Sequence, residues 1–201
     1  MTCIVGIISK VNNQITIGGD SVGACGYDVT VRKDPKVFRI GDFLFGCTTS
    51  FRMMQLVRYS FEPPAITAPC VGLSQSSEPE DIFKYMCTSF VNSLRTCLKQ
   101  GGVLEMKNEV EQGGEFLVSY KDRLFCIAGD FQVSESVEHF ASVGCGSSYA
   151  LGALKALTEN TALDGEELAK KALEIASHFS GAVRPPFNFV TTYPVGEKAP
   201  A

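Results

Sequence analysis

Residues 1–21 read MTCIVGIISKVNNQITIGGDS, and this opening stretch sets the first element of the fold. Two apolar runs, at about 2–9 and 14–19, flank a polar turn at 10–13. Runs rich in Ile and Val around an Asn-containing turn predict a β-hairpin. Such a hairpin returns the chain to Asp20, so we expect Asp20 to lie near the start of the first strand.

Composition bounds the class of protein. The chain has 201 residues, 45% hydrophobic and 20% charged, so we expect one domain over 1–201 with a polar tail from about residue 195. Its net charge of −4 argues against nucleic acid or an anionic membrane as a partner. No apolar run approaches the ~20 residues of a membrane span. Met1 precedes no basic and apolar leader, so we expect no signal peptide and a cytoplasmic location.

Further strands follow from apolar runs bounded by turn residues. Residues 36–40 and 43–47 predict a second hairpin around Gly41-Asp42. Residues 20–32, rich in Gly and polar residues, predict a loop or irregular crossing. Later strands are predicted over 115–120, 123–129, a short run ending near 144, and 187–192.

Four helical segments complete the pattern. One begins near Ser50, and prolines interrupt helix formation over 62–75. A capping box at 77–80 starts a long helix that closes at Gly101-Gly102. Two more helices are predicted, one capped by Ser147 or Ser148 and one starting at a capping box at 164–167 and stopped by Gly181. One face of the long helix carries Ile82, Met86, Phe90, Leu94 and Cys97.

The order of these elements predicts an α+β fold. Antiparallel hairpins alternate with groups of helices, and both early hairpins are apolar on both faces. We therefore expect a four-layer α-β-β-α sandwich, with two sheets packed face to face and helices outside each sheet.

Cysteine and histidine usage gives no indication of a metal site. The eight cysteines include no C-x-x-C pair, and neither of the two histidines lies at a metal-ligand spacing from a cysteine. We expect most of the thiols to be reduced and buried, and we expect no cofactor.

The threonine at position 2 suggests catalytic chemistry. Removal of Met1 would give Thr2 a free α-amine, which titrates near 7.7–8.0 in model compounds. The amine can then act as the base for the hydroxyl of the same residue. Lys36 begins a strand expected at the same end of the sheet, and Asp20 can pair with it. The N–H of Gly46 is a candidate donor to an oxyanion.

Five segments in order carry a resemblance to a known family: Thr2-Cys3-Ile4-Val5, Gly18-Gly19-Asp20, Pro35-Lys36-Val37, Phe45-Gly46 and Val143 to Ala150. Together they resemble proteasome β-type subunits, and most of all the peptidase of the HslV type. The resemblance implies an N-terminal nucleophile hydrolase fold in which Thr2 attacks protein or peptide carbonyls. It also implies a homo-oligomeric ring fed by a separate ATP-dependent unfoldase. Asp20 and Lys36 would form the charged pair, with Lys33 as a competing lysine, and Gly46 would donate to the oxyanion.

Three positions depart from the family pattern. Cys145 stands where the family has a serine near the nucleophile's amine, and a thiol is the weaker hydrogen-bonding group. Ser177-His178 stands where an acidic residue is usual, shortly before Ser180-Gly181. Gly46-Cys47-Thr48-Thr49 replaces a glycine-rich edge, so we expect Cys47 and Thr48 to bind substrate with altered specificity.

Two other functions remain open from the sequence. One is a catalytically silent scaffold or assembly subunit of the same fold, and the other is a small-molecule amidohydrolase. Cys3 is an alternative nucleophile if processing also removes Thr2.

Overall fold

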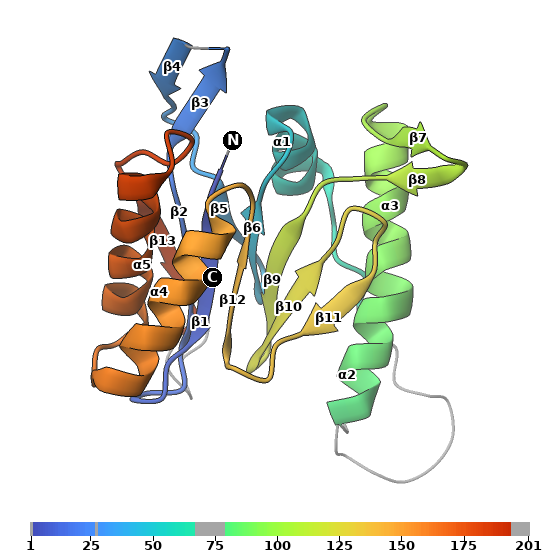
Figure 1. Cartoon of the computed structure of the whole chain (residues 1–201). Helices are drawn as coiled ribbons and strands as arrows, with labels where there is room; N and C mark the ends of the chain where they lie inside the picture. Colours follow the sequence, from blue (N-terminus) through green and yellow to red (C-terminus); the bar gives the residue numbers. More distant parts are fainter. Residues whose placement is uncertain (1, 27, 67–78, 194–201) are drawn as a thin grey trace, which may run out of the picture.

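The computed structural model describes residues 2–26, 28–66 and 79–193. Two β-sheets pack face to face in the middle, and helices cover the outer face of each sheet (Figure 1). This arrangement confirms the predicted α+β sandwich. The expected polar tail from about residue 195 lies outside the described residues.

The first sheet contains the N-terminal hairpin in the predicted place. Its strand order is β12-β1-β2-β13, all antiparallel, and Ile4 of β1 pairs with Gly19 of β2. This register brings the start of β1 beside the end of β2, as the sequence predicts for Asp20. The bounds are β1 Ile4–Ile8, β2 Ile15–Gly19, β12 Phe140–Val143 and β13 Asn188–Thr191.

The second sheet contains the second predicted hairpin. Its order is β11-β10-β9-β6-β5, and β6 lies between its hairpin partner β5 and the later strand β9. The strand β11 is absent from the sequence prediction, because its three residues are too few to show an alternating pattern. The bounds are β5 Val37–Ile40, β6 Phe43–Cys47, β9 Phe116–Tyr120, β10 Arg123–Ile127 and β11 Val133–Glu135.

Two small hairpins lie outside these sheets. Residues 20–32 are not an irregular crossing, since β3 and β4 pair there in a ribbon that projects from the sandwich (Figure 1). β4 alternates polar and apolar residues, but all four are exposed, so the ribbon is held by its backbone pairing and not by burial of an apolar face. The bounds are β3 Val22–Cys25, β4 Asp28–Val31, β7 Glu105–Lys107 and β8 Val110–Gln112.

The helices follow the sequence prediction with local differences. The long helix is divided by a π-helical turn at Met86–Phe90, and its predicted start at Ser77-Glu78 lies outside the described residues. Asp164 makes the expected capping box, and α5 ends at Phe179 with Ser180 as its C-cap, directly before the predicted stop at Gly181. Gly146, and not a serine, precedes α4. The bounds are α1 Phe51–Ser60, α2 Pro79–Tyr85, α3 Val91–Gln100, α4 Ser147–Asn160 and α5 Gly165–Phe179.

Three apolar clusters separate the four layers. The central cluster joins the two sheets and includes Ile4, Ile17 and Leu44, all fully buried. Burial of each such side chain is worth about 1.5–3 kcal/mol, so the hairpin that carries Thr2 is firmly anchored. In the described part of the chain, no helix has the length and apolar character needed to cross a membrane.

Candidate active site

The charged residues predicted from the sequence meet at one end of the two sheets. Thr2 precedes β1, Asp20 follows β2, and Lys36 precedes β5. Lys36 Nζ donates to Thr2 Oγ1 at 3.1 Å and to both carboxylate oxygens of Asp20 at 3.0 Å. One ammonium therefore joins the hydroxyl of Thr2 to a carboxylate, as the sequence predicts for Lys36. The competing Lys33 is exposed.

This group is held away from water. The side chains of Asp20 and Lys36 are 0% and 2% exposed. Asp20 also accepts the backbone N–H groups of Cys3 and Val22, each at 2.9 Å. Burial lowers the pKa of the Lys36 ammonium, and the attraction of Asp20 opposes that shift. Because two backbone N–H groups hold the Asp20 carboxylate, it fixes the position of the ammonium.

Cys145 lies beside the nitrogen of Thr2. The N–H of Thr2 donates to Cys145 Sγ at 3.1 Å, and that thiol donates to the Thr2 carbonyl at 3.4 Å. The backbone at Gly144 can approach the Thr2 carbonyl closely because Gly144 has no side chain and adopts a φ of +94°. A Cβ at this position would lie 2.4 Å from the Thr2 carbonyl oxygen. The Cys145 thiol thus lies beside the Thr2 nitrogen, where the family resemblance implies a serine in other members.

Cys3 is poorly suited to be the nucleophile in this structure. Its side chain is fully buried, and its Sγ lies 3.8 Å from Ser142 Oγ. Burial raises the pKa of its thiol to about 12, so the thiol stays protonated near neutral pH. The seven described cysteines are free thiols, and Cys70 lies outside the described residues. Among the described side chains, no group of three or more His, Cys, Asp or Glu is arranged to hold a metal ion.

Gly46 is not positioned for the role predicted from the sequence. It pairs with Leu117 of β9, and Thr48, two residues later, donates its N–H to the Glu115 carbonyl on the same side at 3.1 Å. Because N–H groups along a strand alternate between its two neighbours, the Gly46 N–H faces β9 inside the sheet. A Cβ on Gly46 would lie 2.3 Å from Ile4 Cγ2, so this glycine serves the close contact between sheets.

A cavity of about 160 Å³ opens beside Thr2. Cys47 and Thr48, the two predicted substrate-binding residues, form part of its wall. Thr49 also lines it, with a φ of +70° that the sequence does not reveal. Other lining residues absent from the sequence prediction come from the β3 ribbon and from the start of α1: Ala24, Ser50, Phe51 and Met54.

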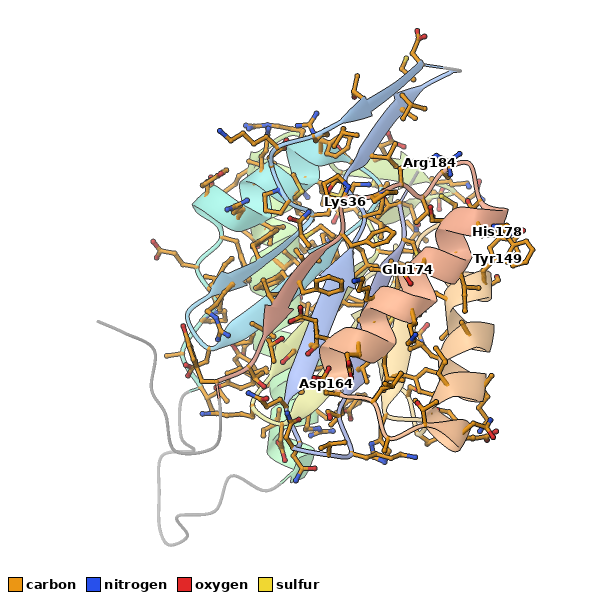
Figure 2. The ribbon with its side chains drawn as sticks, turned by 90° about the vertical axis from the view of Figure 1, so that its left-hand side faces the viewer. Lys36, Tyr149, Asp164, Glu174, His178 and Arg184 are labelled. Atoms are coloured by element: carbon orange, nitrogen blue, oxygen red, sulfur yellow. The ribbon has the colours of Figure 1, made fainter. Side chains whose placement is uncertain are left out.

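Ser177 and His178, which stand where the family usually has an acidic residue, lie away from Thr2. His178 is exposed near the end of α5, where its ring contacts Phe179, which in turn stacks on Tyr149. Figure 2 shows His178 and Tyr149 together at the edge of the molecule, away from Lys36. The backbone carbonyl of Ser177 accepts a hydrogen bond from the Arg184 guanidinium at 3.1 Å. Neither Ser177 nor His178 contributes a side-chain contact to the group around Thr2.

Comparison with solved structures defines the class of fold. The structure titled "Thiobacillus denitrificans BPH in complex with Epoxomicin" matches with a TM-score of 0.75 and 22% identity, covering 98% of this chain and 100% of that one. Eukaryotic HslV from Trypanosoma brucei matches with a TM-score of 0.63 and 17% identity, covering 94% and 98%. The chain therefore has the HslV-type N-terminal nucleophile hydrolase fold that the sequence predicts.

Part of the chain is also similar in sequence to a curated relative. The ATP-dependent protease subunit HslV of Caldicellulosiruptor saccharolyticus is 44% identical over 61 residues, which are 30% of this chain and 35% of the relative. The chain thus spans about a third of the length of the curated relatives it matches. No family model matches the chain. Together with the structures, this similarity confirms the resemblance to an HslV-like, proteasome β-type peptidase subunit.

Proposed function

We propose that this protein is a threonine-type endopeptidase in which Thr2, once Met1 is removed, is the nucleophile. The observation that carries the proposal is the Lys36 ammonium, which joins Thr2 Oγ1 to the buried carboxylate of Asp20. A hydroxyl that accepts from a fixed ammonium is stabilised as it loses its proton.

The reaction follows from the groups at the site. The neutral α-amine of Thr2 takes the Oγ1 proton, and Oγ1 attacks the carbonyl carbon of the peptide. The amine then protonates the leaving nitrogen, the C–N bond breaks, and an ester to Thr2 remains. Water attacks this ester with the amine again as base, which releases the acid and restores the hydroxyl. Cys145 orients the amine, and Lys36 remains an ammonium throughout.

We assign the oxyanion donor to the Thr49 N–H in place of that of Gly46. Thr49 lies in the wall of the cavity that contains Thr2, and among the described residues its N–H has no hydrogen-bond acceptor. Its left-handed conformation lies outside the sheet ladder, where a backbone N–H is available to a substrate. Removing such a donor typically costs about 10²–10³ in kcat, so this contact is a substantial part of the proposed catalysis.

We propose that the protein acts as a subunit of a homo-oligomeric ring with an ATP-dependent partner. The support is that the curated relatives are named as ATP-dependent protease subunits, together with the fold. Sedimentation of the native protein as a monomer would argue against the ring. The cytoplasmic location stays a prediction.

Hydrolysis of fluorogenic peptides by the native protein, Thr2→Ser and Thr2→Ala tests the proposed chemistry. We expect native activity, reduced activity in Thr2→Ser and none in Thr2→Ala, because only a side-chain oxygen can form the ester. Absence of hydrolysis in all three, with every other function of Thr2→Ala intact, would favour a silent scaffold. Hydrolysis of simple amides but no peptide would favour an amidohydrolase.

A further inference from the structure

We propose that Cys145 and the α-amine of Thr2 form a redox modification site, at which a hydroperoxide oxidises the thiol and the amine then closes a reversible S–N bond. This inference rests on the proposed function, because Met1 must be removed before Thr2 carries a free amine. It goes beyond that function, because the S–N bond withdraws the base and stops hydrolysis. The modified protein stays inactive until a thiol reductant cleaves the bond.

The nitrogen of Thr2 and the sulfur of Cys145 are already in contact. Thr2 N lies 3.1 Å from Cys145 Sγ, although the two residues are 143 positions apart in the sequence. On one side of the thiol, Val143 pairs with Ile4 of β1. On its other side, the Gly146 N–H donates to the Thr2 carbonyl at 3.3 Å. Formation of an S–N bond therefore needs the rotation of one side chain and leaves the strands in place.

The Cys145 thiol can be reached from solvent. Cys145 is exposed, whereas the neighbouring Cys3 is fully buried. Burial raises the pKa of the Cys3 thiol to about 12, so that thiol stays protonated near neutral pH. Because cysteine oxidation depends on exposure and on thiolate content, Cys145 is the thiol beside Thr2 that a hydroperoxide attacks.

Oxidation of Cys145 is the first step. Its thiolate attacks one peroxide oxygen, the O–O bond breaks, and the other oxygen leaves and takes up a proton to give an alcohol or water. The sulfur becomes a sulfenic acid, and the peroxide is reduced. A serine at this position, as the family resemblance implies in other members, lacks this chemistry. The cysteine therefore adds a reaction to the site.

The amine of Thr2 resolves the sulfenic acid. In its neutral form, which predominates above a pKa of about 7.7–8.0 in model compounds, it attacks the sulfur. The S–O bond breaks, and hydroxide leaves and combines with the amine proton as water, as when a sulfenic acid condenses with a backbone nitrogen. The Lys36 ammonium does not compete, because it donates to both oxygens of Asp20. The chain has then lost two hydrogens, and the nitrogen no longer serves as the base for Oγ1.

A thiol reductant reverses the modification. It attacks the sulfur of Cys145 and displaces the Thr2 amine, which leaves a mixed disulfide, and a second thiol then releases the Cys145 thiol. The reductant is oxidised to its own disulfide, and the protein regains the groups with which it started. The site thus alternates between an active reduced form and an inactive oxidised form.

The intact mass of the native protein before and after treatment with hydrogen peroxide tests the inference. We expect a chain lighter by the mass of two hydrogen atoms, with the peptide that begins at Thr2 linked to the peptide that contains Cys145. Residual peptide hydrolysis should equal the fraction of unmodified chains, and excess dithiothreitol should restore both the mass and the activity. Chains that gain only oxygen, or a link between Cys145 and Cys3, would overturn the inference.

Two variants provide matched controls, and each is compared with its own untreated sample. Cys145→Ser should form no link to Thr2 and should keep its rate of hydrolysis in peroxide. Cys25→Ser removes another exposed thiol, at the end of β3 in the projecting ribbon, and should respond to peroxide as the native protein does. Equal sensitivity of the native protein and Cys145→Ser would contradict the assignment of Cys145.

The mass and the activity together separate this inference from the proposed function. An untreated protein that hydrolyses peptides but forms no link after oxidation supports the proposed function and overturns the modification site. A protein that begins at Thr2, hydrolyses no peptide and still forms the link overturns the proposed function alone. Retention of Met1 in the native protein overturns both.

Discussion

Replacement of Lys36 by methionine is expected to destabilise the fold strongly. The two Asp20 oxygens each lie 3.0 Å from Lys36 Nζ, and the Asp20 side chain is fully buried. Removing one partner of a buried ion pair typically costs about 3–5 kcal/mol. Asp20 keeps the N–H donors of Cys3 and Val22, so we expect the lower half of that range. For a chain of this length, each kcal/mol corresponds to a loss of about 2–4 °C in Tm.

A double-mutant cycle isolates the pair. Urea unfolding of Lys36→Met, Asp20→Asn and the double variant, at one protein concentration, should show the double variant losing less than the sum of the singles by about 0.5–3 kcal/mol. Lys99→Met is the matched control, because it removes an exposed lysine that pairs with Glu111 at 2.9 Å. Additive single effects, or a Lys36→Met variant no less stable than Lys99→Met, would refute the reasoning.

Three further predictions concern activity. Burial lowers the pKa of the Lys36 ammonium from its ordinary value of 10.5, so the ammonium loses its proton as pH rises, and kcat/KM should begin to decrease before pH 10.5 is reached. On the acid side, kcat/KM should decrease at or below about pH 7.7, where the Thr2 amine becomes protonated. Cys145→Ser should raise kcat/KM about fivefold, since a hydroxyl bonds the amine more strongly than a thiol, by roughly 1 kcal/mol. Gly144→Ala should lower kcat/KM by at least about tenfold, because its Cβ would displace the Thr2 carbonyl.

Each of these predictions has a measurement that contradicts it. A pH profile of kcat/KM that stays flat beyond pH 10.5 would show that the Lys36 charge is not needed. Cys145→Ser with activity equal to Cys145→Ala would show that the group at this position does not bond the amine. Gly152→Ala is the control for Gly144→Ala, because nothing lies within 4 Å of its added carbon, and equal losses in both would exclude a specific displacement of Thr2.

The sequence predicts the layers of this fold because its hairpins and helices carry strong local signals. The apolar runs at 2–9 and 14–19, and those at 36–40 and 43–47, each form the expected pair of strands, and Asp164 forms the expected cap. The ribbon at 22–31 was harder to predict, because its alternating segment at 28–31 is only four residues long and lies in a stretch rich in glycine and polar residues.

The same distinction applies to the site. Thr2, Asp20 and Lys36 were predictable because hairpin geometry places strand ends together. The N–H direction of Gly46 depends on which neighbour β6 meets on its other side, a contact with β9 that is distant in sequence. The left-handed backbone of Thr49 has no compositional signal, because threonine rarely adopts that conformation. Backbone direction and cavity shape therefore required the structure.

The most direct test of the central claim is the intact mass of the native protein before and after treatment with an epoxyketone such as epoxomicin, the ligand named in the Thiobacillus denitrificans structure. We predict a chain lighter than the encoded one by Met1, and a single adduct on the peptide that begins with Thr2. The adduct requires both the α-amine and Oγ1, so Thr2→Ala should show none. A mass that retains Met1, or an adduct located on Cys145, would contradict the assignment of Thr2 as nucleophile and base.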